Sequence, residues 1–400
     1  MAGVLDGVRV LDFGRYIAGP YCTTMLGYLG ADVIRVEKLK GGEDRYVYPL
    51  HHKEDGSEGE GSLFLQVGAN KKSVTLNPAK PEAKDIIRRL VQSADVVVAN
   101  MPIQALKTLG LDYDSLKAIK PDIIMTSIST FGPSGPYAHR GGFDGIGQVM
   151  SGAAYFSGTV GNPVKSNAPW VDFGTAIISA YATLAAIMHH RATGEGQEVE
   201  GALLRTGLTY MNGLLMEQAV LELDRVPSAN RVQTSAPSDI YKTKDGHVLT
   251  HTVGDALFGR WAEMVGDKDK WVNDPRFRSD QSRGDNGTVI GERMAEWCAE
   301  HTTAEVIDLC EKFGVPAGPV LTPRQALEDP QVQAMGDLYP MDIPGVDKKV
   351  PIAGPPFRLS KTPGTMRVRP PMLGEHTDEV MRELGYGDAE IADFRAKRII

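Results

Sequence analysis

The feature that most constrains the fold is a strand–helix–strand pattern within the first 40 residues. "GVRVLDF" at 7–13 has the pattern of a short buried strand, "YCTTMLGYLG" at 21–30 that of a helix, and "ADVIRVE" at 31–37 that of a second strand. A β-α-β unit of this length implies parallel strands joined by a crossover helix. Further strand patterns occur at 72–77, 95–100 and 122–129. We therefore predict an α/β fold with a doubly wound parallel sheet.

The length of 400 residues exceeds what one compact core usually holds, so a second domain is expected. A change of character near "RVPSANRVQTSAPSD" at 225–239 predicts a hinge. After it, "IYKTKDGHVLTHTV" predicts a hairpin that turns at "DGH", at 245–247, within a smaller α+β domain. The polar segment between Lys40 and Gly68 is long for a simple connection, and we expect a mobile loop there that serves as a lid.

Charge and cysteine content exclude several classes. The net charge of −8 argues against nucleic-acid binding, which usually requires a basic face. The three cysteines are scattered, which argues against disulfides or a zinc site and suits a reducing cytoplasm; they are Cys22, Cys298 and Cys310. We expect Cys22 to be a small buried residue, although the start of a helix could also lower a thiol pKa.

Two segments of the sequence indicate whether the chain is exported or enters a membrane. The first dozen residues include Asp6, Arg9 and Asp12, which is unlike a signal peptide, so a cytoplasmic location is expected. The apolar run from Phe173 to Met188 is shorter than the roughly 20 residues that a bilayer requires. We interpret it as a buried helix and expect no membrane association.

Common catalytic motifs are missing from the sequence. "GRYIAGP" at 14–20 follows the first strand, where open α/β sheets bind ligands, but it is neither GxGxxG nor a P-loop. "GPSGP" at 132–136 is not a serine-hydrolase elbow, and the His51-His52 and His189-His190 pairs lack metal-site spacing, so no metal is expected. Basic residues near strand ends could converge to bind phosphates, or could be separate solvated charges; they are Arg15, Lys38, Lys71, Lys72 and Arg140.

Asp172 lies at the head of the most apolar part of the chain, "SNAPWVDFGTAIISAYATLAAIMHH" at 166–190. One interpretation is structural, because aspartate is a preferred N-cap and a helix is expected from about Phe173. The other is catalytic: a carboxylate, ionised at neutral pH with an ordinary pKa of about 3.9, could attack an acyl carbonyl without a general base. Trp170 and Phe173 would then shield the intermediate from water. Both interpretations stay open on the local sequence alone.

Seven segments together resemble the class III CoA-transferases, the CaiB/BaiF and formyl-CoA transferase family, nearly end to end and in order. They are the Asp172 segment, "LDGVRVLDFGRYIAGPYCTTMLGYLGADVIRVEK", "NKKSVTLN", "GGFDGIGQVMSG", "TGEGQEVEGALL", "GVPAGPVLTPRQALEDPQV" and "LGEHTDEVMRELG". The resemblance implies a homodimer of interlocked, ring-like chains. It also implies a Rossmann-like large domain from 1–205 and 329–400, a linker helix and hinge at 206–235, and a small α+β domain at 236–328.

The same resemblance implies the chemistry. Asp172 would attack a donor thioester to form an aspartyl-acyl anhydride, CoA thiolate would convert this to an aspartyl-CoA thioester, and an acceptor carboxylate would take CoA through a second anhydride. The CoA thioester is thus a substrate, no cofactor is permanently bound, and the active site lies at a domain and subunit interface. The implied CoA contacts are Arg15, Tyr16, Ile17, Ala18, Lys38, Leu76, Asn77, Asn100, Met101, Arg140, Gly141, Gly142, Phe143 and Asp144.

Departures from the family pattern indicate which activities within the family are favoured. Ile17 stands where formyl-CoA transferases have glutamine, and the chain lacks their "GGGGQ" loop, which speaks against oxalate as acceptor. One CoA-contact segment, which usually reads "ENF" in the family, reads "ANM" at 99–101 of this chain. The racemase branch has a "GHD" histidine as its second acid/base, but Phe143 stands there, which favours transfer over racemisation. An α-methylacyl-CoA racemase or isomerase, and a non-catalytic CoA-thioester-binding protein, remain alternatives.

Overall fold

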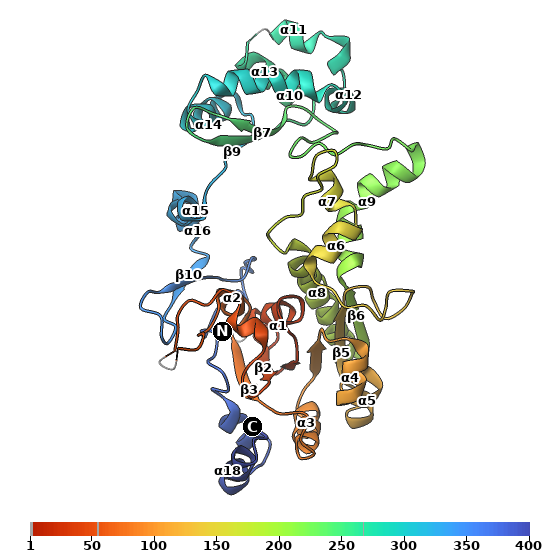
Figure 1. Ribbon diagram of the computed structural model, residues 1–400, viewed down its shortest axis with the longest axis vertical. Coiled ribbons are helices and arrows are strands. Elements are labelled where there is room, and N and C mark those ends of the chain that lie inside the picture. Colours follow the sequence, from red (N-terminus) through yellow and green to blue (C-terminus); the bar gives the residue numbers. More distant parts are fainter. Residues whose placement is uncertain (1–2, 54–55, 267) are drawn as a thin grey trace. The chain divides into compact units, whose positions relative to one another are not determined.

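The computed structural model describes residues 3–53, 56–266 and 268–400, which form two compact units (Figure 1). The first unit contains Met1–Ser151, Ser166–Met216 and Met335–Ile400, and the second contains Gly152–Lys165 and Glu217–Ala334. Residues 152–165 lie in the second unit, although we placed them within the 1–205 segment. The reason is a backbone contact: the amide of Ala229 donates to the carbonyl of Gly158 at 2.8 Å.

The first unit is built on a six-stranded, all-parallel sheet in the order β3-β2-β1-β4-β5-β6. Its strands are β1 (Arg9–Asp12), β2 (Asp32–Glu37), β3 (Lys71–Thr75), β4 (Val96–Ala99), β5 (Ile124–Ser129) and β6 (Glu198–Ala202). The chain reverses its direction of winding between β1 and β4, which creates a switch point at the carboxyl ends of these strands. The prediction of a doubly wound parallel sheet is confirmed.

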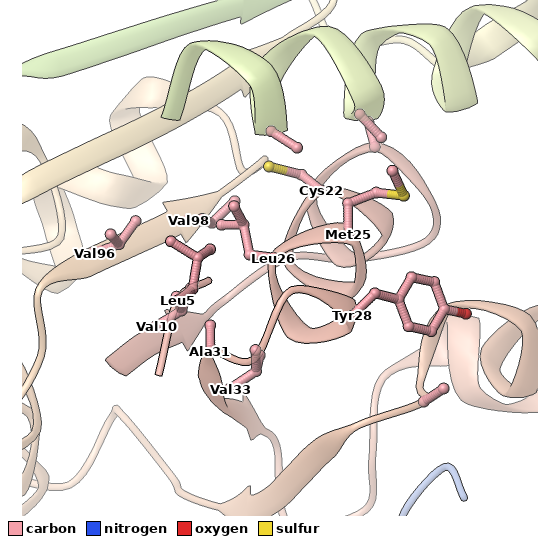
Figure 2. Close-up of a cluster of buried hydrophobic side chains, with 14 of the residues drawn as sticks. Leu5, Val10, Cys22, Met25, Leu26, Tyr28, Ala31, Val33, Val96 and Val98 are labelled. Carbon is pink, nitrogen blue, oxygen red and sulfur yellow. The ribbon is translucent and has the colours of Figure 1, made fainter. Parts of the chain in front are cut away.

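Both faces of this sheet are covered by helices, which explains the apolar strands. Alternate residues of a strand point to opposite faces. One face carries a cluster that contains Val10, Val33, Val96 and Val98, together with Cys22 and Leu26 of α1; Figure 2 shows these side chains gathered around that helix. The other face carries a separate cluster that contains Leu11, Ile34, Val97 and Ala99.

Most helices of the first unit connect or flank these strands. They are α1 (Ala18–Tyr28), α2 (Ser62–Val67), α3 (Ala83–Gln92), α4 (Ile103–Leu109), α5 (Tyr113–Ile119), α6 (Asp144–Met150), α8 (Trp170–Thr193), α17 (Thr377–Glu383) and α18 (Asp388–Ala396), with the 3₁₀ turn η1 (Glu43–Tyr46). Helix α9 (Leu203–Leu221) begins in the first unit and ends in the second. Met335–Ile400 adds the antiparallel hairpin of β10 (Leu338–Met341) and β11 (Val350–Ala353). It also places α17 beside β3, where the Thr75 amide donates to Thr377 Oγ1 at 3.1 Å.

Helix α8 is longer than we expected. It has 24 residues, so by length and composition it could cross a membrane, and the argument from a short Phe173–Met188 run is wrong. Ten of its residues are buried, and several of them belong to the same hydrophobic cluster as α1. A single apolar helix that is mostly buried is typical of the core of a globular protein, and such a helix is weak evidence for a membrane span.

The polar segment between Lys40 and Gly68 is anchored at both ends rather than free as a lid. The Arg45 guanidinium is fully buried, donates to the Glu37 carboxylate at 2.6 and 3.1 Å, and lies 3.8 Å from the centre of the Phe64 ring. Glu60 also lies within 3.5 Å of Arg45. The expectation of a mobile loop is therefore wrong for these flanks; residues 54–55 lie outside the described part.

The second unit combines a small antiparallel sheet with helices. The sheet contains β7 (Ser238–Lys242), β8 (His247–His251) and β9 (Ala317–Pro319), and residues 243–246 form the turn between β7 and β8, where the DGH hairpin was expected. The helices are α7 (Ala153–Phe156), α10 (Asp255–Met264), α11 (Lys268–Val272), α12 (Asp280–Asp285), α13 (Gly287–Ala299), α14 (Thr303–Phe313), α15 (Pro323–Glu328) and α16 (Pro330–Met335), with the 3₁₀ turn η2 (Pro275–Phe277). Aromatic rings in stacked, tilted and edge-to-face contacts fill its core, among them Phe258, Trp261, Trp271 and Phe277.

Candidate active site

Two neighbouring cavities open at the carboxyl ends of the strands, near the switch point of the sheet. The larger has a volume of about 530 Å³ and includes Asp172 in its wall. Among the predicted site residues, it is lined by Arg15, Tyr16, Ile17, Ala18, Asn100, Met101, Gly141, Gly142, Phe143 and Asp172. The smaller has a volume of about 140 Å³ and is lined, among others, by Arg15, Lys38, Leu76 and Met101. Segments far apart in sequence are thus brought to one edge of the sheet, as the topology predicts.

Three predicted contact residues line neither cavity. The Asn77 side-chain oxygen accepts the backbone N–H of Ala79 at 3.2 Å, and the Asn77 backbone N–H donates to the Ile399 carbonyl at 2.7 Å. The Arg140 guanidinium lies 4.0 Å from the centre of the Tyr137 ring. The Asp144 carboxylate is turned toward α8. For Asn77, Arg140 and Asp144, the structure gives structural partners in place of the expected position at the cavity.

The turn after β1 is held in a strained conformation. Tyr16 has a φ of 59°, in the left-handed region that favours glycine. The Asn100 side chain clamps the preceding residue, because its Oδ1 accepts the Arg15 amide at 2.6 Å and its Nδ2 donates to the Arg15 carbonyl at 2.8 Å. The Tyr16 amide donates to Asp44 Oδ2 at 3.1 Å. Asp44 is a residue that sequence reasoning missed, since its role depends on a contact 28 residues away.

An aromatic pair, which includes Tyr16 of this turn, lines the larger cavity. The rings of Tyr16 and Phe143 meet edge to face, with 5.2 Å between their centres. Phe143 is 61% exposed, which leaves most of its ring available to a ligand. Deeper in the cavity the lining includes Ile17, Ile128 and Leu203, so the surroundings of Asp172 are mainly apolar.

Asp172 does not cap its own helix. Helix α8 begins at Trp170 after Pro169, so Asp172 is the third helical residue and the N-cap interpretation is wrong. Because the proline side chain has no acceptor, the cap comes from another helix. Oδ1 of Asp144 accepts the amides of Val171 at 2.8 Å and of Asp172 at 3.0 Å. The Asp172 side chain is therefore left free to face the cavity.

The surroundings of Asp172 favour its neutral form. Burial and, second, the nearby negative charge of Asp144 together raise the pKa of this carboxyl to about 7, against a smaller lowering by the Asp144 backbone. The residue is 8% exposed. We expected an ionised carboxylate with an ordinary pKa of about 3.9, whereas the surroundings of Asp172 raise this pKa to about 7.

The expected aromatic shield has different partners. Trp170 packs against Tyr210 with 5.6 Å between ring centres, and Phe173 against Tyr21 with 4.8 Å. Neither Trp170 nor Phe173 lines the cavity that contains Asp172. These rings therefore fasten the first turn of α8 to its neighbours, and the cavity itself is lined by aliphatic side chains that include Ile17, Ile128 and Leu203.

Only part of the predicted basic cluster converges. The Glu43 carboxylate accepts from the Arg15 guanidinium at 2.7 Å and from the Lys38 ammonium at 3.3 Å, so these two cations share one anion at the cavity rim. Lys71 is buried against Asp12 at 2.7 Å. Lys72 lies among Asp32, Glu379 and Glu383, away from the cavity. Of the five predicted cations, Arg15 and Lys38 are the two that line the cavities.

Metal and thiol chemistry receive no support from the described residues. Within 3–53, 56–266 and 268–400, no three His, Cys, Asp or Glu side chains gather closely enough to hold a metal ion. The Cys22 thiol is buried, and burial together with the negative charge of Asp12 raises its pKa to about 12. The expectation that Cys22 is a buried small residue is confirmed, and a reactive thiolate there is disfavoured.

The raised pKa of Asp172 has a measurable consequence for stability. Between pH 3.8 and about 7 the folded state binds more protons than the unfolded state, so stability is lost as the pH rises through this window. Asp172→Asn is therefore expected to stabilise the protein more at pH 8 than at pH 5, by up to about 3 kcal/mol. Urea unfolding at both pH values measures this difference.

Asp122→Asn provides the control of opposite sign. Hydrogen bonds from Lys120 and His190 hold the pKa of Asp122 below its usual range. Loss of this carboxylate should slightly destabilise the protein at pH 8. If Asp172→Asn stabilised the protein no more at pH 8 than at pH 5, the pKa of the Asp172 carboxyl would not be raised in the folded state.

Comparisons with known proteins agree on one family. The sequence profile described as CoA-transferase family III matches residues 5–377. The chain is 31% identical over 401 aligned residues to succinyl-CoA–D-citramalate CoA-transferase of Chloroflexus aurantiacus, covering 99% of this chain and 98% of that one. It is 30% identical to formyl-CoA:oxalate CoA-transferase of Afipia carboxidovorans, covering 99% and 97%. A crystal structure of a CAIB/BAIF family protein from Brucella suis superimposes with a TM-score of 0.81 at 30% identity, covering 96% of this chain and all of that one. The chain therefore belongs to CoA-transferase family III and is an enzyme of that class.

Proposed function

We propose that this enzyme transfers CoA from an acyl-CoA to a free carboxylic acid through covalent intermediates on Asp172. The observation that carries the proposal is the position of this carboxylate. It lies in the wall of a mainly apolar cavity, beside a rim that carries Arg15 and Lys38. A buried carboxylate near two cations that can bind phosphate groups suits a reaction between a carboxylate and a CoA thioester.

The proposed sequence balances without any further reagent. An Asp172 oxygen attacks the acyl carbonyl, the C–S bond breaks, and CoA leaves as thiolate from an aspartyl-acyl anhydride. The thiolate attacks the aspartyl carbonyl, the donor acid leaves as carboxylate, and an aspartyl-CoA thioester remains. The acceptor carboxylate then displaces the thiolate to give a second anhydride. The thiolate attacks the acyl carbon of this anhydride that comes from the acceptor. This step releases the new acyl-CoA and restores the Asp172 carboxylate. One thioester replaces another, so no energy source is consumed.

The electrostatics of the site favour the first step. A carboxylate with a pKa near 7 is a stronger nucleophile than one with an ordinary pKa, because basicity and nucleophilicity rise together within one type of group. Acylation removes the negative charge of Asp172 and relieves its repulsion by Asp144. The apolar lining keeps water from a reactive anhydride, for which water would be a competing nucleophile.

The CoA molecule would occupy both cavities. Arg15 and Lys38 would bind phosphate groups, which must displace the Glu43 carboxylate that now pairs with both. Such exposed ion pairs contribute little free energy, so the exchange costs little. Leu76 and Met101 give the smaller cavity an apolar surface suited to the flat face of a base.

The acceptor and donor are proposed at the level of class. The named relatives act on succinyl-CoA with D-citramalate and on formyl-CoA with oxalate. We propose a carboxylic acid acceptor for this chain, with oxalate disfavoured because Ile17 offers no polar group where formyl-CoA transferases have glutamine. The relatives support transfer over the racemase and the binding-only alternatives.

An interlocked homodimer in the cytoplasm is part of the proposal. Helices α8 and α9 expose large apolar side chains within the first unit, including Ile177, Ile178, Tyr181, Met188, Leu208 and Tyr210. Apolar surface of this extent is typical of a buried subunit interface. The three cysteines are free and buried, as expected in a reducing compartment.

A solvent-isotope experiment distinguishes transfer from racemisation. In deuterium oxide, with an α-branched acyl-CoA and an acceptor acid, we expect new acyl-CoA to form and the α-carbon to gain no deuterium in step with turnover. Mass spectrometry of both CoA esters measures the two events together. Deuterium uptake without CoA exchange would identify a racemase, and neither event with any of a panel of acids would leave only a binding protein.

A further inference from the structure

Gln148 is a buried side chain to which neither the family assignment nor the proposed mechanism gives a role. It lies on α6 and is 1% exposed. Its carboxamide does not reach the cavity wall. Buried amides are usually retained because their hydrogen bonds are specific, so the partners of this one indicate what it does.

Both ends of the Gln148 carboxamide bind the segment that leads into α8. Nε2 donates to Asp144 Oδ2 at 2.5 Å and lies 3.3 Å from the Ser166 carbonyl oxygen. Oε1 accepts the Ser166 amide at 2.8 Å. Only a group with a donor on one side and an acceptor on the other meets this arrangement. A carboxylate would turn an oxygen toward Asp144, and an aliphatic side chain would remove all of these hydrogen bonds.

The contact with Asp144 connects Gln148 to the nucleophile. While Oδ2 of Asp144 accepts from Gln148, its Oδ1 accepts the amides of Val171 and Asp172. The Asp144 carboxylate therefore joins the first turns of α6 and α8, and Gln148 fixes the rotation of this carboxylate.

Close packing makes this junction sensitive to small movements. A Cβ on Gly147 would lie 2.6 Å from Val171 Cγ1, so the two helices approach closely at this point. Pro169 supplies no side-chain cap to α8, so the orientation of its first turn depends on Asp144. A shift of about 1 Å in a reacting group is enough to lower a rate by about 100-fold.

We infer that Gln148 is a positioning residue for Asp172, acting through Asp144 and through the entry to α8. The inference rests on the proposed role of Asp172 as nucleophile. Gln148 does not touch the substrate, so its removal should affect the chemical step and leave the binding of CoA intact.

The experiment compares Gln148→Leu with Thr183→Val. Thr183 lies on α8, is buried as Gln148 is, and shares a 2.6 Å hydrogen bond with Thr126. Thr183→Val therefore removes a buried side-chain hydrogen bond at a position away from Asp172. We expect Gln148→Leu to lower kcat by 10- to 100-fold with KM for acyl-CoA within about threefold of wild type. Thr183→Val should keep kcat within about twofold. An equal loss of kcat in both variants would overturn the inference.

Amide exchange tests the positioning step without catalysis. In Gln148→Leu, hydrogen–deuterium exchange at the amides of Val171 and Asp172 should become at least tenfold faster, and Thr183→Val should leave it unchanged. Unchanged exchange in Gln148→Leu would also overturn the inference. If Asp172 proved dispensable for transfer while this exchange still increased, the proposed function would fail and the positioning contact would stand.

Gln148→Glu covers the case in which the leucine variant does not fold. It keeps the shape of the side chain and the acceptor for Ser166, and it replaces the donor that faces Asp144 by an oxygen. We expect a folded protein by circular dichroism with a kcat at least tenfold below wild type. A Gln148→Glu enzyme with wild-type kcat would contradict the role assigned here.

Discussion

Replacing Asp172 with alanine is expected to lower kcat for CoA transfer by at least about 10³-fold, the usual scale for loss of a covalent nucleophile. The methyl group offers no oxygen for the anhydride, so the C–S bond of the donor has no attacking group. Binding of CoA should persist or tighten, since Arg15 and Lys38 are unchanged and a buried negative charge near the thioester is removed. Transfer measured by mass spectrometry and CoA binding measured by calorimetry give the two quantities.

The intermediate itself can be captured in the wild-type enzyme. Hydroxylamine added during turnover should convert the activated Asp172 carboxyl to a hydroxamate, seen as a mass increase on the peptide that contains it. Asp122→Ala is the matched control, because Asp122 pairs with His190 at the opposite end of α8. It should keep its transfer rate within about twofold. An Asp172→Ala enzyme that retained a tenth of wild-type kcat would exclude the covalent mechanism.

Replacing Lys71 with methionine is expected to destabilise the protein by about 3–5 kcal/mol, the cost of breaking a buried ion pair from one side. The Lys71 ammonium donates to Asp12 Oδ2 at 2.7 Å and to the Pro20 carbonyl at 2.6 Å. Both charged side chains are fully buried. Asp12 also accepts the amide of Gly14 at 2.8 Å, so the pair fixes the turn that lines the larger cavity. Loss of the ammonium would leave a buried carboxylate without its cation.

The pH dependence of this effect has a definite sign. Burial alone would raise the pKa of Asp12, but Lys71 and Arg35 outweigh it and hold that pKa below its usual range. The stabilisation is therefore present above the unfolded value of 3.8 and is lost as the pH falls through the lower, folded value. Without Lys71, the carboxyl would regain a raised pKa and bind a proton. The deficit of Lys71→Met should therefore be smaller at pH 5 than at pH 8.

The neighbouring lysine provides the control. Lys72 lies on the same strand with its side chain 25% exposed among acidic residues, and Lys72→Met should cost no more than about 1 kcal/mol. The double variant Asp12→Asn, Lys71→Met should recover part of the loss, because an amide is easier to bury than a charge. Urea midpoints measure all three. Equal midpoints for Lys71→Met and Lys72→Met would show that the buried pair does not stabilise the sheet.

The elements of the parallel sheet follow from local patterns. Short apolar runs such as 31–37 predict buried strands, and the spacing of Ile86, Ile87, Leu90 and Val91 predicts the helix that packs on them. Those patterns also place "GRYIAGP" at the carboxyl edge of the sheet. They work because the burial of apolar side chains depends on periodicity within a few residues, which the sequence displays directly.

The polar contacts of the site could not be read from the sequence in the same way. Asp172 has the composition expected of an N-cap, yet Asp144, 28 residues earlier, caps α8. Asn100 lines the cavity as expected, but the sequence does not show that its side-chain amide also hydrogen-bonds the backbone of Arg15, 85 residues away. Nothing in the local spacing shows which distant donor will meet which acceptor.

What the sequence determined by itself is therefore the α/β class, the position of the cavity edge and the identity of Asp172 as the residue to examine. Only the tertiary structure decided the surroundings of that residue. These are its burial, its raised pKa, the hydrogen bond from its amide to Asp144 and the contact of Gln148 with Asp144. The physical reason is that hydrophobic burial is set by patterns along the chain, whereas the energy of a buried charge is set by the few groups within about 4 Å, which come from segments joined only when the chain folds.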